Sequence, residues 1–241
     1  MQLESNLTVA EIAARSLAAV RLFEQKGIDY CCGGRRPLAE VCNEKGIDPD
    51  MLKRELEAAL SAGQAQERDW SSASLQDLAE HIVGTHHEYL KRELPLLAGR
   101  LAKVYRIYNE RYGPTLVGLP ETYDGLRSEL EMHMMKEERI LFPNIAAAEQ
   151  AVAASGRMPP QPFGSFANPI AMMEREHDSA GGALVRIREI TGNFALPDYA
   201  CATYRALMKG FEELEQDLHL HIHLENNILF PRTLEMERKY R

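Results

Sequence analysis

The sequence predicts an all-α protein in which a small N-terminal helical domain precedes an up-and-down four-helix bundle. From Ser74 onward, four long stretches place apolar residues at alternating steps of three and four, the spacing of helices with one buried face. Turns rich in Gly and Pro separate these stretches, and four long helices joined by turns favour a bundle. The length of 241 residues accommodates such a bundle beside a smaller domain.

The N-terminal domain is predicted at residues 1–65, followed by a polar linker at 66–74 that carries the only tryptophan. Thr8 and Glu11 have the spacing of a capping box, and the apolar pattern after them predicts one helix that ends at Gly27. Two further helices are expected, one near 37–45 and one that begins at Asp48-Pro49 and runs to about Ala62.

The bundle is predicted at residues 75–241. Its helices are expected at about 75–110, 121–149, 169–191 and 198–238. Pro95, Pro143 and Pro231 fall inside or near the ends of these patterns, so we expect each to kink or end its helix.

Composition limits the classes of function. A hydrophobic share of 45% and a charged share of 27% are ordinary for soluble proteins, and no long apolar run or N-terminal leader pattern is present, so we expect a soluble, cytoplasmic protein without a membrane partner. A net charge of -8 without a Lys/Arg block argues against a nucleic-acid partner. The four cysteines are too few and too unevenly placed for a disulfide framework, which favours a reducing compartment.

One phrase occurs twice in the bundle. His133-Met-Met-Lys-Glu137-Glu-Arg-Ile-Leu-Phe-Pro returns as His221-Ile-His-Leu-Glu225-Asn-Asn-Ile-Leu-Phe-Pro. On a helix, a histidine and a glutamate four residues apart share one face about 6 Å apart, which is a spacing of metal ligands. A further histidine, His87 or His177, precedes each copy at a similar distance, so the unit is one histidine followed by His-x-x-x-Glu.

The apolar face of each helix predicts which histidines point inward. The four predicted faces are Val83, His87, Leu90, Leu94, Leu97 and Leu101; Leu126, Leu130, His133, Glu137 and Ile140; Ile170, Met173, His177, Ala180, Leu184 and Ile187; and Leu207, Phe211, Leu214, Leu218, His221, Glu225 and Ile228. His81, His86, His219 and His223 fall off these faces and are not expected to reach the same point.

Two glutamates in a bundle core need compensation for their lost hydration, and bound metal supplies it. Four imidazoles and two carboxylates exceed the ligands of one tetrahedral zinc, so the repeat favours two metals with Glu137 and Glu225 placed to bridge them. Iron suits this ligand set best, while nickel, copper and zinc remain open. A single inward histidine is more often a hydrogen-bonded core residue, but four on four helices with two paired glutamates disfavour that interpretation.

Three acidic residues adjoin the predicted ligands: Glu138, Glu176 and Asp178. They could orient the histidines, although a solvated surface position is the favoured interpretation.

The adjacent Cys31 and Cys32 lie between Tyr30 and a Gly-Gly pair. A disulfide between neighbouring residues is strained and easily reduced, which points to a redox or metal-handling role and makes both thiols candidate catalytic groups. The alternative is inert packing of two small apolar side chains in a turn. Cys42 and Cys201 have no local motif and are expected to be buried and structural.

Together these motifs resemble the Repair of Iron Centers family of di-iron proteins, of the YtfE/ScdA type. The phrase Asp29-Tyr-Cys-Cys-Gly-Gly resembles the hallmark of that family's N-terminal domain, and the two His-x-x-x-Glu phrases with Glu176-His-Asp resemble its hemerythrin-like C-terminal domain. The resemblance implies two non-haem iron ions held by His87, His133, Glu137, His177, His221 and Glu225, bridged by the two carboxylates and an oxygen species.

The resemblance also implies a function: repair of iron-sulfur clusters damaged by nitrosative or oxidative stress, by supplying iron. The implied partners are damaged iron-sulfur proteins, with nitric oxide or O2 as small ligands, and the oligomeric state is left open, a homodimer included. Three alternatives remain, a hemerythrin-like binder or sensor of O2 or nitric oxide, a nitric-oxide reductase or di-iron oxidase, and a metal-free helical interaction protein. Whether the protein turns over as an enzyme is therefore uncertain at this point.

Overall fold

The computed structural model describes residues 7–14, 16–31, 33–63, 70–112 and 116–241. Within these ranges every regular element is a helix, apart from one isolated antiparallel bridge between Thr8 and Pro37. The predicted all-α fold is confirmed. The helices are α1 (Val9–Ala13), α2 (Leu17–Gln25), α3 (Leu38–Lys45), α4 (Pro49–Gly63), α5 (Leu75–Ile82), α6 (Glu88–Tyr112), α7 (Leu119–Lys136), α8 (Phe142–Ser155), α9 (Ala167–Thr191), α10 (Ala202–Leu224) and α11 (Phe230–Tyr240), with the π-helical segments η1 (Val83–His87), η2 (Glu137–Leu141) and η3 (Glu225–Leu229) between them.

The chain forms two compact units. Unit 1 consists of residues 1–79, 148–160 and 219–241, and unit 2 of residues 80–147 and 161–218. The predicted domains, 1–65 and 75–241, are consecutive segments of the chain, whereas each compact unit combines separate segments. The predicted boundaries stay a prediction. Part of the predicted linker, residues 66–69, lies outside the described residues, as do residues 113–115 and Cys32.

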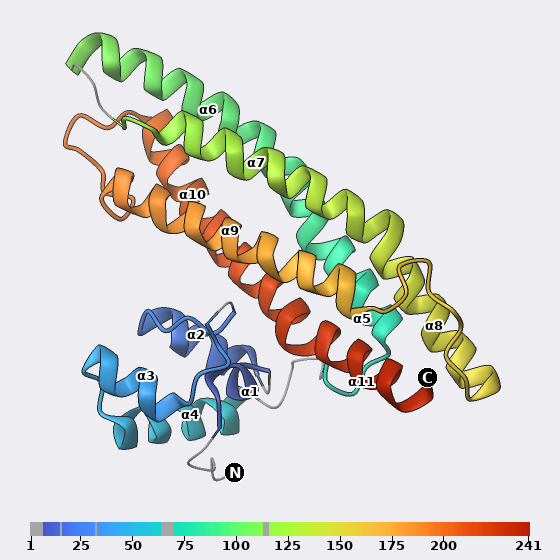
Figure 1. Ribbon diagram of the computed structural model, residues 1–241. Helices are drawn as coiled ribbons and strands as arrows, with labels where there is room; N and C mark the ends of the chain where they lie inside the picture. Colours follow the sequence, from blue (N-terminus) through green and yellow to red (C-terminus); the bar gives the residue numbers. More distant parts are fainter. Residues whose placement is uncertain (1–6, 15, 32, 64–69, 113–115) are drawn as a thin grey trace. The chain divides into compact units, whose positions relative to one another are not determined.

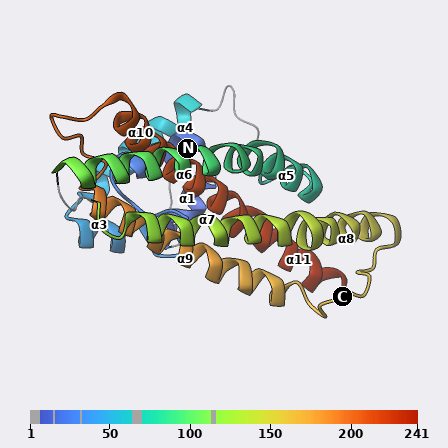
Figure 2. The same ribbon diagram turned by 90° about the horizontal axis from the view of Figure 1, so that it is seen from above.

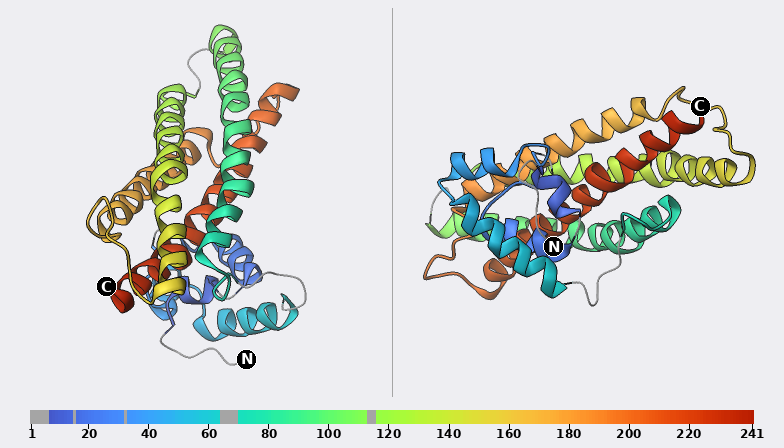
Figure 3. Two further views of the ribbon diagram at one scale, coloured as in Figure 1. Left: turned by 90° about the vertical axis from the view of Figure 1, so that its right-hand side faces the viewer. Right: turned by 90° about the horizontal axis from the view of Figure 1, so that it is seen from below.

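In unit 1, the four short helices α1 to α4 form one cluster (Figure 1; Figure 3). The capping box is present: the Thr8 hydroxyl accepts the Glu11 backbone N–H, and the Glu11 carboxylate accepts the Thr8 backbone N–H. The prediction of one helix up to Gly27 is wrong, because α1 ends at Ala13 and Ser16 caps a separate α2 by accepting the N–H of Ala18.

The later helices of this cluster begin and end as the sequence predicts. Asp48 caps α4 by accepting the N–H groups of Asp50 and Met51, and Pro49 occupies its first turn. Gly46 closes α3 with φ of 66°, a left-handed conformation that favours glycine. The apolar core of the cluster includes one residue from α10, Ile222, which is 1% exposed. The small domain therefore completes its core with a helix from the other end of the chain.

Unit 2 contains the predicted four-helix bundle. Helices α6, α7, α9 and α10 run side by side (Figure 1), and α7 lies along α9 in the view from above as well (Figure 2). Their facing apolar side chains form one core. Its aromatic and leucine members are Leu90, Leu94, Leu97, Leu101, Tyr108, Leu119, Tyr123, Leu126, Leu130, Leu184, Tyr204, Leu207, Phe211, Leu214 and Leu218. The bundle is confirmed.

The prolines do not end their helices. Pro95 lies inside α6, and Pro143 and Pro231 lie in the first turns of α8 and α11, directly after η2 and η3. A proline has no N–H to donate, and Pro143 and Pro231 each stand two residues after the end of a π-helical segment rather than at a free helix start. The chain therefore stays helical through both copies of Ile-Leu-Phe-Pro. No described helix is long and apolar enough to cross a membrane.

Candidate metal centre

The six predicted ligands are all buried. His87, Glu137 and Glu225 are fully covered, and His133, His177 and His221 are at most 2% exposed. Each histidine comes from a different bundle helix or its continuation: η1, α7, α9 and α10. The inward direction that the apolar faces predict is confirmed for all four.

In unit 2, three histidines converge on one carboxylate. The Nε2 atoms of His87 and His133 lie 3.4 and 3.3 Å from Oε2 of Glu137. The Nε2 atom of His177 lies 3.1 Å from that of His133. Three imidazoles thus direct the same ring nitrogen toward one small volume, as ligands of a common centre do.

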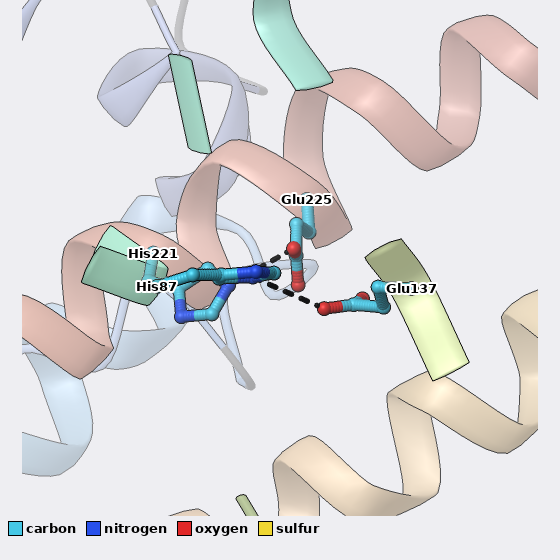
Figure 4. A group of neighbouring side chains, drawn as sticks. All are labelled: His87, Glu137, His221 and Glu225. Carbon is cyan, nitrogen blue, oxygen red and sulfur yellow. Dashed lines mark hydrogen bonds and ion pairs between the residues drawn. The ribbon is translucent and has the colours of Figure 1, made fainter. Parts of the chain in front are cut away.

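The second copy of the phrase repeats the pairing of a histidine with the glutamate four residues later. His221 and Glu225 approach to 3.0 Å between Nε2 and Oε1. Two groups of four residues each have ligand atoms within 4.8 Å of one another and could hold a metal ion: His87, Glu137, His221 and Glu225 (Figure 4), and His133, Glu137, His177 and Glu225. Both glutamates belong to both groups. The two groups together contain all six predicted residues, while their roles as ligands stay a prediction.

The far sides of two histidines are held by carboxylates. Nδ1 of His87 lies 2.9 Å from Glu138, which also pairs with Lys91, and Nδ1 of His133 lies 2.9 Å from Glu176, which also pairs with Lys136. For these two glutamates the favoured surface interpretation is wrong. A carboxylate on Nδ1 orients the ring so that Nε2 points to the opposite side, where a metal would bind. Asp178, by contrast, is exposed, as the surface interpretation predicts.

Electrostatics keeps both supporting carboxylates ionised. Hydrogen bonding to His133 and then Lys136 lowers the pKa of Glu176 to about 2, against the opposing effect of partial burial. Partial burial also opposes ionisation of Glu138, yet hydrogen bonds from Lys91 and His87 lower its pKa below the usual range. The sequence reasoning did not single out either lysine. Each lies one helical turn after its histidine, a spacing that could have indicated them.

The remaining histidines belong to neither group. His86 is 2% exposed and pairs through Nδ1 with Asp217, in unit 2. His223 is 1% exposed and lies against the ring of Tyr30, in unit 1, where burial lowers its pKa to about 4. Exclusion of these histidines from the ligand groups agrees with their predicted places off the apolar faces.

The apolar face of α7 shifts by one residue after Glu137. Ile140, predicted inward, is 50% exposed, whereas Leu141 is 2% exposed. The cause is η2, because a π-helical turn contains one extra residue and rotates all later positions by about 100°. A similar shift at η1 buries Ile82 in place of Val83, which is only half-buried. In α9, which has no π segment, all six predicted positions are buried.

The cysteines differ from one another. Cys31 is 6% exposed and hydrogen bonds with Asp29, and Cys32 lies outside the described residues. Cys42 is buried, as predicted, and burial raises the pKa of its thiol. The prediction for Cys201 is wrong: it is exposed, directly before the first residue of α10.

The residues fit a transition-metal centre. Four imidazole nitrogens and two carboxylates form a mixed N/O donor set that suits iron, and buried carboxylates are stable only when positive charge or hydrogen bonds compensate for lost hydration. No strong nucleophile lies within the two groups.

Comparison with known proteins agrees with this donor set. Residues 78–233 match the Hemerythrin HHE cation binding domain, and residues 5–60 match the ScdA_N model, a domain of unknown function (DUF542). The chain is similar to proteins named "Iron-sulfur cluster repair protein YtfE": 39% identical to that of Dickeya chrysanthemi (strain Ech1591) and 37% to that of Pectobacterium atrosepticum, each over 95% of this chain and 97% of the relative. The protein of Escherichia coli O81 (strain ED1a) is 40% identical over the same shares. The chain therefore belongs to the YtfE family of iron-sulfur cluster repair proteins, with a hemerythrin-type cation-binding domain.

Proposed function

We propose that this chain is a di-iron protein that repairs iron-sulfur clusters damaged by nitrosative or oxidative stress by supplying iron. The names of its relatives support the repair function. The buried histidine and glutamate groups support metal binding. Its partners would be damaged iron-sulfur proteins, with nitric oxide or O2 as small ligands.

One observation carries the proposal of two ions rather than one. Glu137 and Glu225 occur in both groups of four, and each group adds two histidines of its own. A carboxylate has two oxygens and can therefore serve two neighbouring ions. Six residues then supply each of two sites with four ligand atoms, without any further protein group. An oxygen bridge between the ions stays a prediction.

The side chains around the groups would hold the ligands in place. Glu138 and Glu176 fix the rings of His87 and His133 from the Nδ1 side, and their own lysines keep them ionised. Bound iron would be the metal that is passed to a damaged cluster. Cys31 and Cys32 are the proposed thiols for that transfer, because soft sulfur ligands accept iron outside the N/O site.

The test is iron transfer. Purified protein is loaded with iron, its metal content is measured, and it is mixed with an iron-sulfur protein whose cluster nitric oxide has damaged. The expected result is recovery of the cluster signal with a matching loss of iron from this protein. Reversible gas binding without loss of iron would instead identify a hemerythrin-like carrier or sensor. Sustained turnover of nitric oxide to nitrous oxide would identify a reductase, and absence of bound metal would refute the proposal.

A further inference from the structure

The two copies of the repeated phrase differ directly after the glutamate. The first continues Glu138-Arg139, and the second continues Asn226-Asn227. In unit 1 both asparagine side chains donate to the backbone of the cysteine motif: Nδ2 of Asn227 to the carbonyl of Tyr30 at 2.8 Å, and Nδ2 of Asn226 to the carbonyl of Cys31 at 3.4 Å. The two residues after a predicted metal ligand thus bind the backbone of the candidate transfer motif.

The Tyr30 side of the contact is buried, and it has further contacts. Tyr30 is 1% exposed, its ring packs edge-on against His223 at 5.5 Å, and its hydroxyl donates to Glu24 at 2.8 Å. Nδ2 of Asn227 also lies 2.8 Å from Nδ1 of His223. Ile222, in the same turn of α10, is buried in the core of the N-terminal cluster. Hydrogen bonds in such surroundings are costly to lose, because a buried carbonyl without its donor is not rehydrated.

The described residues of the motif are also held by local contacts. The Asp29 carboxylate accepts the N–H groups of both Cys31 and Gly33. A Cβ atom at Gly34 would lie only 2.4 Å from the Tyr30 carbonyl oxygen, so backbone approaches backbone closely there. Movement of Asn226 and Asn227 would therefore displace the backbone of Tyr30 and Cys31 together and uncover Cys31, which is 6% exposed in the structure.

We infer that Asn226 and Asn227 couple the backbone of Tyr30 and Cys31, called the Cys31 loop below, to η3. Metal held by His221 and Glu225 would then keep the Cys31 thiol covered, and loss of metal would expose it. The inference rests on the proposed function for the presence of the metal. Glu225 is the first residue of η3, and the two asparagines follow it directly. A metal that fixes the position of Glu225 therefore also restricts the positions of Asn226 and Asn227. Coupling of this kind is reciprocal: opening of the loop weakens metal binding by the same factor.

The consequence for function is that the metal content of the site determines when the Cys31 thiol is accessible. A thiol that stays covered while the site is loaded is protected from oxidants, and it becomes available when iron leaves. Asn226 and Asn227 are thus positioning residues that act through the loop rather than groups that react.

The test measures alkylation of Cys31 by iodoacetamide, read by peptide mass spectrometry, in iron-loaded and chelator-treated protein. We expect removal of iron to speed the reaction about tenfold, a usual size for coupling between two sites. Cys201, which is exposed, serves as an internal control and should react at the same rate in both samples.

The variant Asn227→Leu removes the donor at nearly constant volume. It is expected to alkylate rapidly at Cys31 even when loaded with iron, to within about twofold of the metal-free rate. Asn168→Leu is the matched control, because Nδ2 of Asn168 also donates to a backbone carbonyl, that of Phe163, at 3.0 Å in unit 2. Should Asn227→Leu lose helical content by circular dichroism, Asn227→Ala replaces it in the same assay.

The outcomes separate the two proposals. A chain without bound metal would overturn the proposed function. Bound metal with equal Cys31 rates in the loaded and stripped protein would overturn only the coupling, as would an Asn227 variant that reacts like the Asn168 control.

Discussion

Glu137 and Glu225 are carboxylates without exposed surface, and such groups are stable in a helix core only when positive charge or hydrogen bonds compensate for lost hydration. The surrounding imidazoles direct Nε2 toward these carboxylates. Glu138 and Glu176 contact two of the rings at Nδ1. At the scale of single residues, these contacts distinguish the predicted ligands from buried histidines such as His86, which pairs with Asp217.

The first prediction compares His133→Ala with Glu225→Ala. Both should reduce bound iron, and Glu225→Ala should reduce it more, because Glu225 belongs to both groups of four while His133 belongs to one. Iron content by mass spectrometry, with helical content by circular dichroism, measures the effect. His86→Ala is the control, since His86 is equally buried but pairs with Asp217. Iron loss in the control as large as in His133→Ala would contradict the ligand assignment.

The second prediction concerns Cys201. Hydrogen bonding with the Tyr108 side chain, followed by the backbone N–H groups of Tyr204 and Thr203, lowers the pKa of its thiol. A lower pKa means that the reactive thiolate persists to lower pH, so the rate of alkylation should begin to fall at a lower pH than for an ordinary thiol. Tyr108→Phe should move that pH dependence upward. An unchanged rate profile in the variant would show that Tyr108 has no part in the shift.

At the scale of elements, three of the predicted ligands lie in π-helical segments: His87 ends η1, while Glu137 and Glu225 begin η2 and η3. Each segment shifts the register of the residues that follow. Such segments are frequent at functional sites. The extra residue changes the direction of a side chain while the chain stays helical.

The third prediction tests this register. Leu141→Ala should destabilise the metal-free protein by about 2–5 kcal/mol, because it leaves a cavity beneath a side chain that is 2% exposed. Ile140→Ala removes a side chain that is 50% exposed and should cost less than about 0.5 kcal/mol. Urea unfolding followed by circular dichroism compares the two. A larger effect at Ile140 would mean that α7 continues without the extra residue.

The same segments explain what the sequence could and could not predict. A regular period of 3.6 residues identified the inward face of α9 completely and the four inward histidines, since His133, His177 and His221 lie in regular helix and His87 keeps the register of the α6 residues that follow it. Ile140 was misplaced because the extra residue of η2 leaves no mark in the apolar pattern. The contacts of Glu176 with His133 and Lys136 join residues far apart in the chain, so no local spacing in the sequence predicts them.

At the scale of the whole chain, the N-terminal cluster and the final helices belong to one compact unit. Ile222 lies in the core of that cluster, and Asn226 and Asn227 bind its cysteine motif. A domain of about 60 residues has little apolar surface to bury, so Ile222 of α10 adds to a small core and links it to the metal-binding phrase.

The last prediction separates iron binding from repair. Replacing both Cys31 and Cys32 with Ser should leave iron content unchanged, because the two groups of four contain histidine and glutamate only. The same protein should lose the ability to restore a damaged cluster, because the hydroxyl of serine is a poor ligand for iron compared with a thiolate. Cys42→Ser is an unsuitable control, since Cys42 is fully buried in the core. Cys201→Ser, at an exposed position, controls for the loss of a thiol as such. Loss of iron in the double variant would mean that the thiols stabilise the centre, whereas full repair activity would remove them from the transfer.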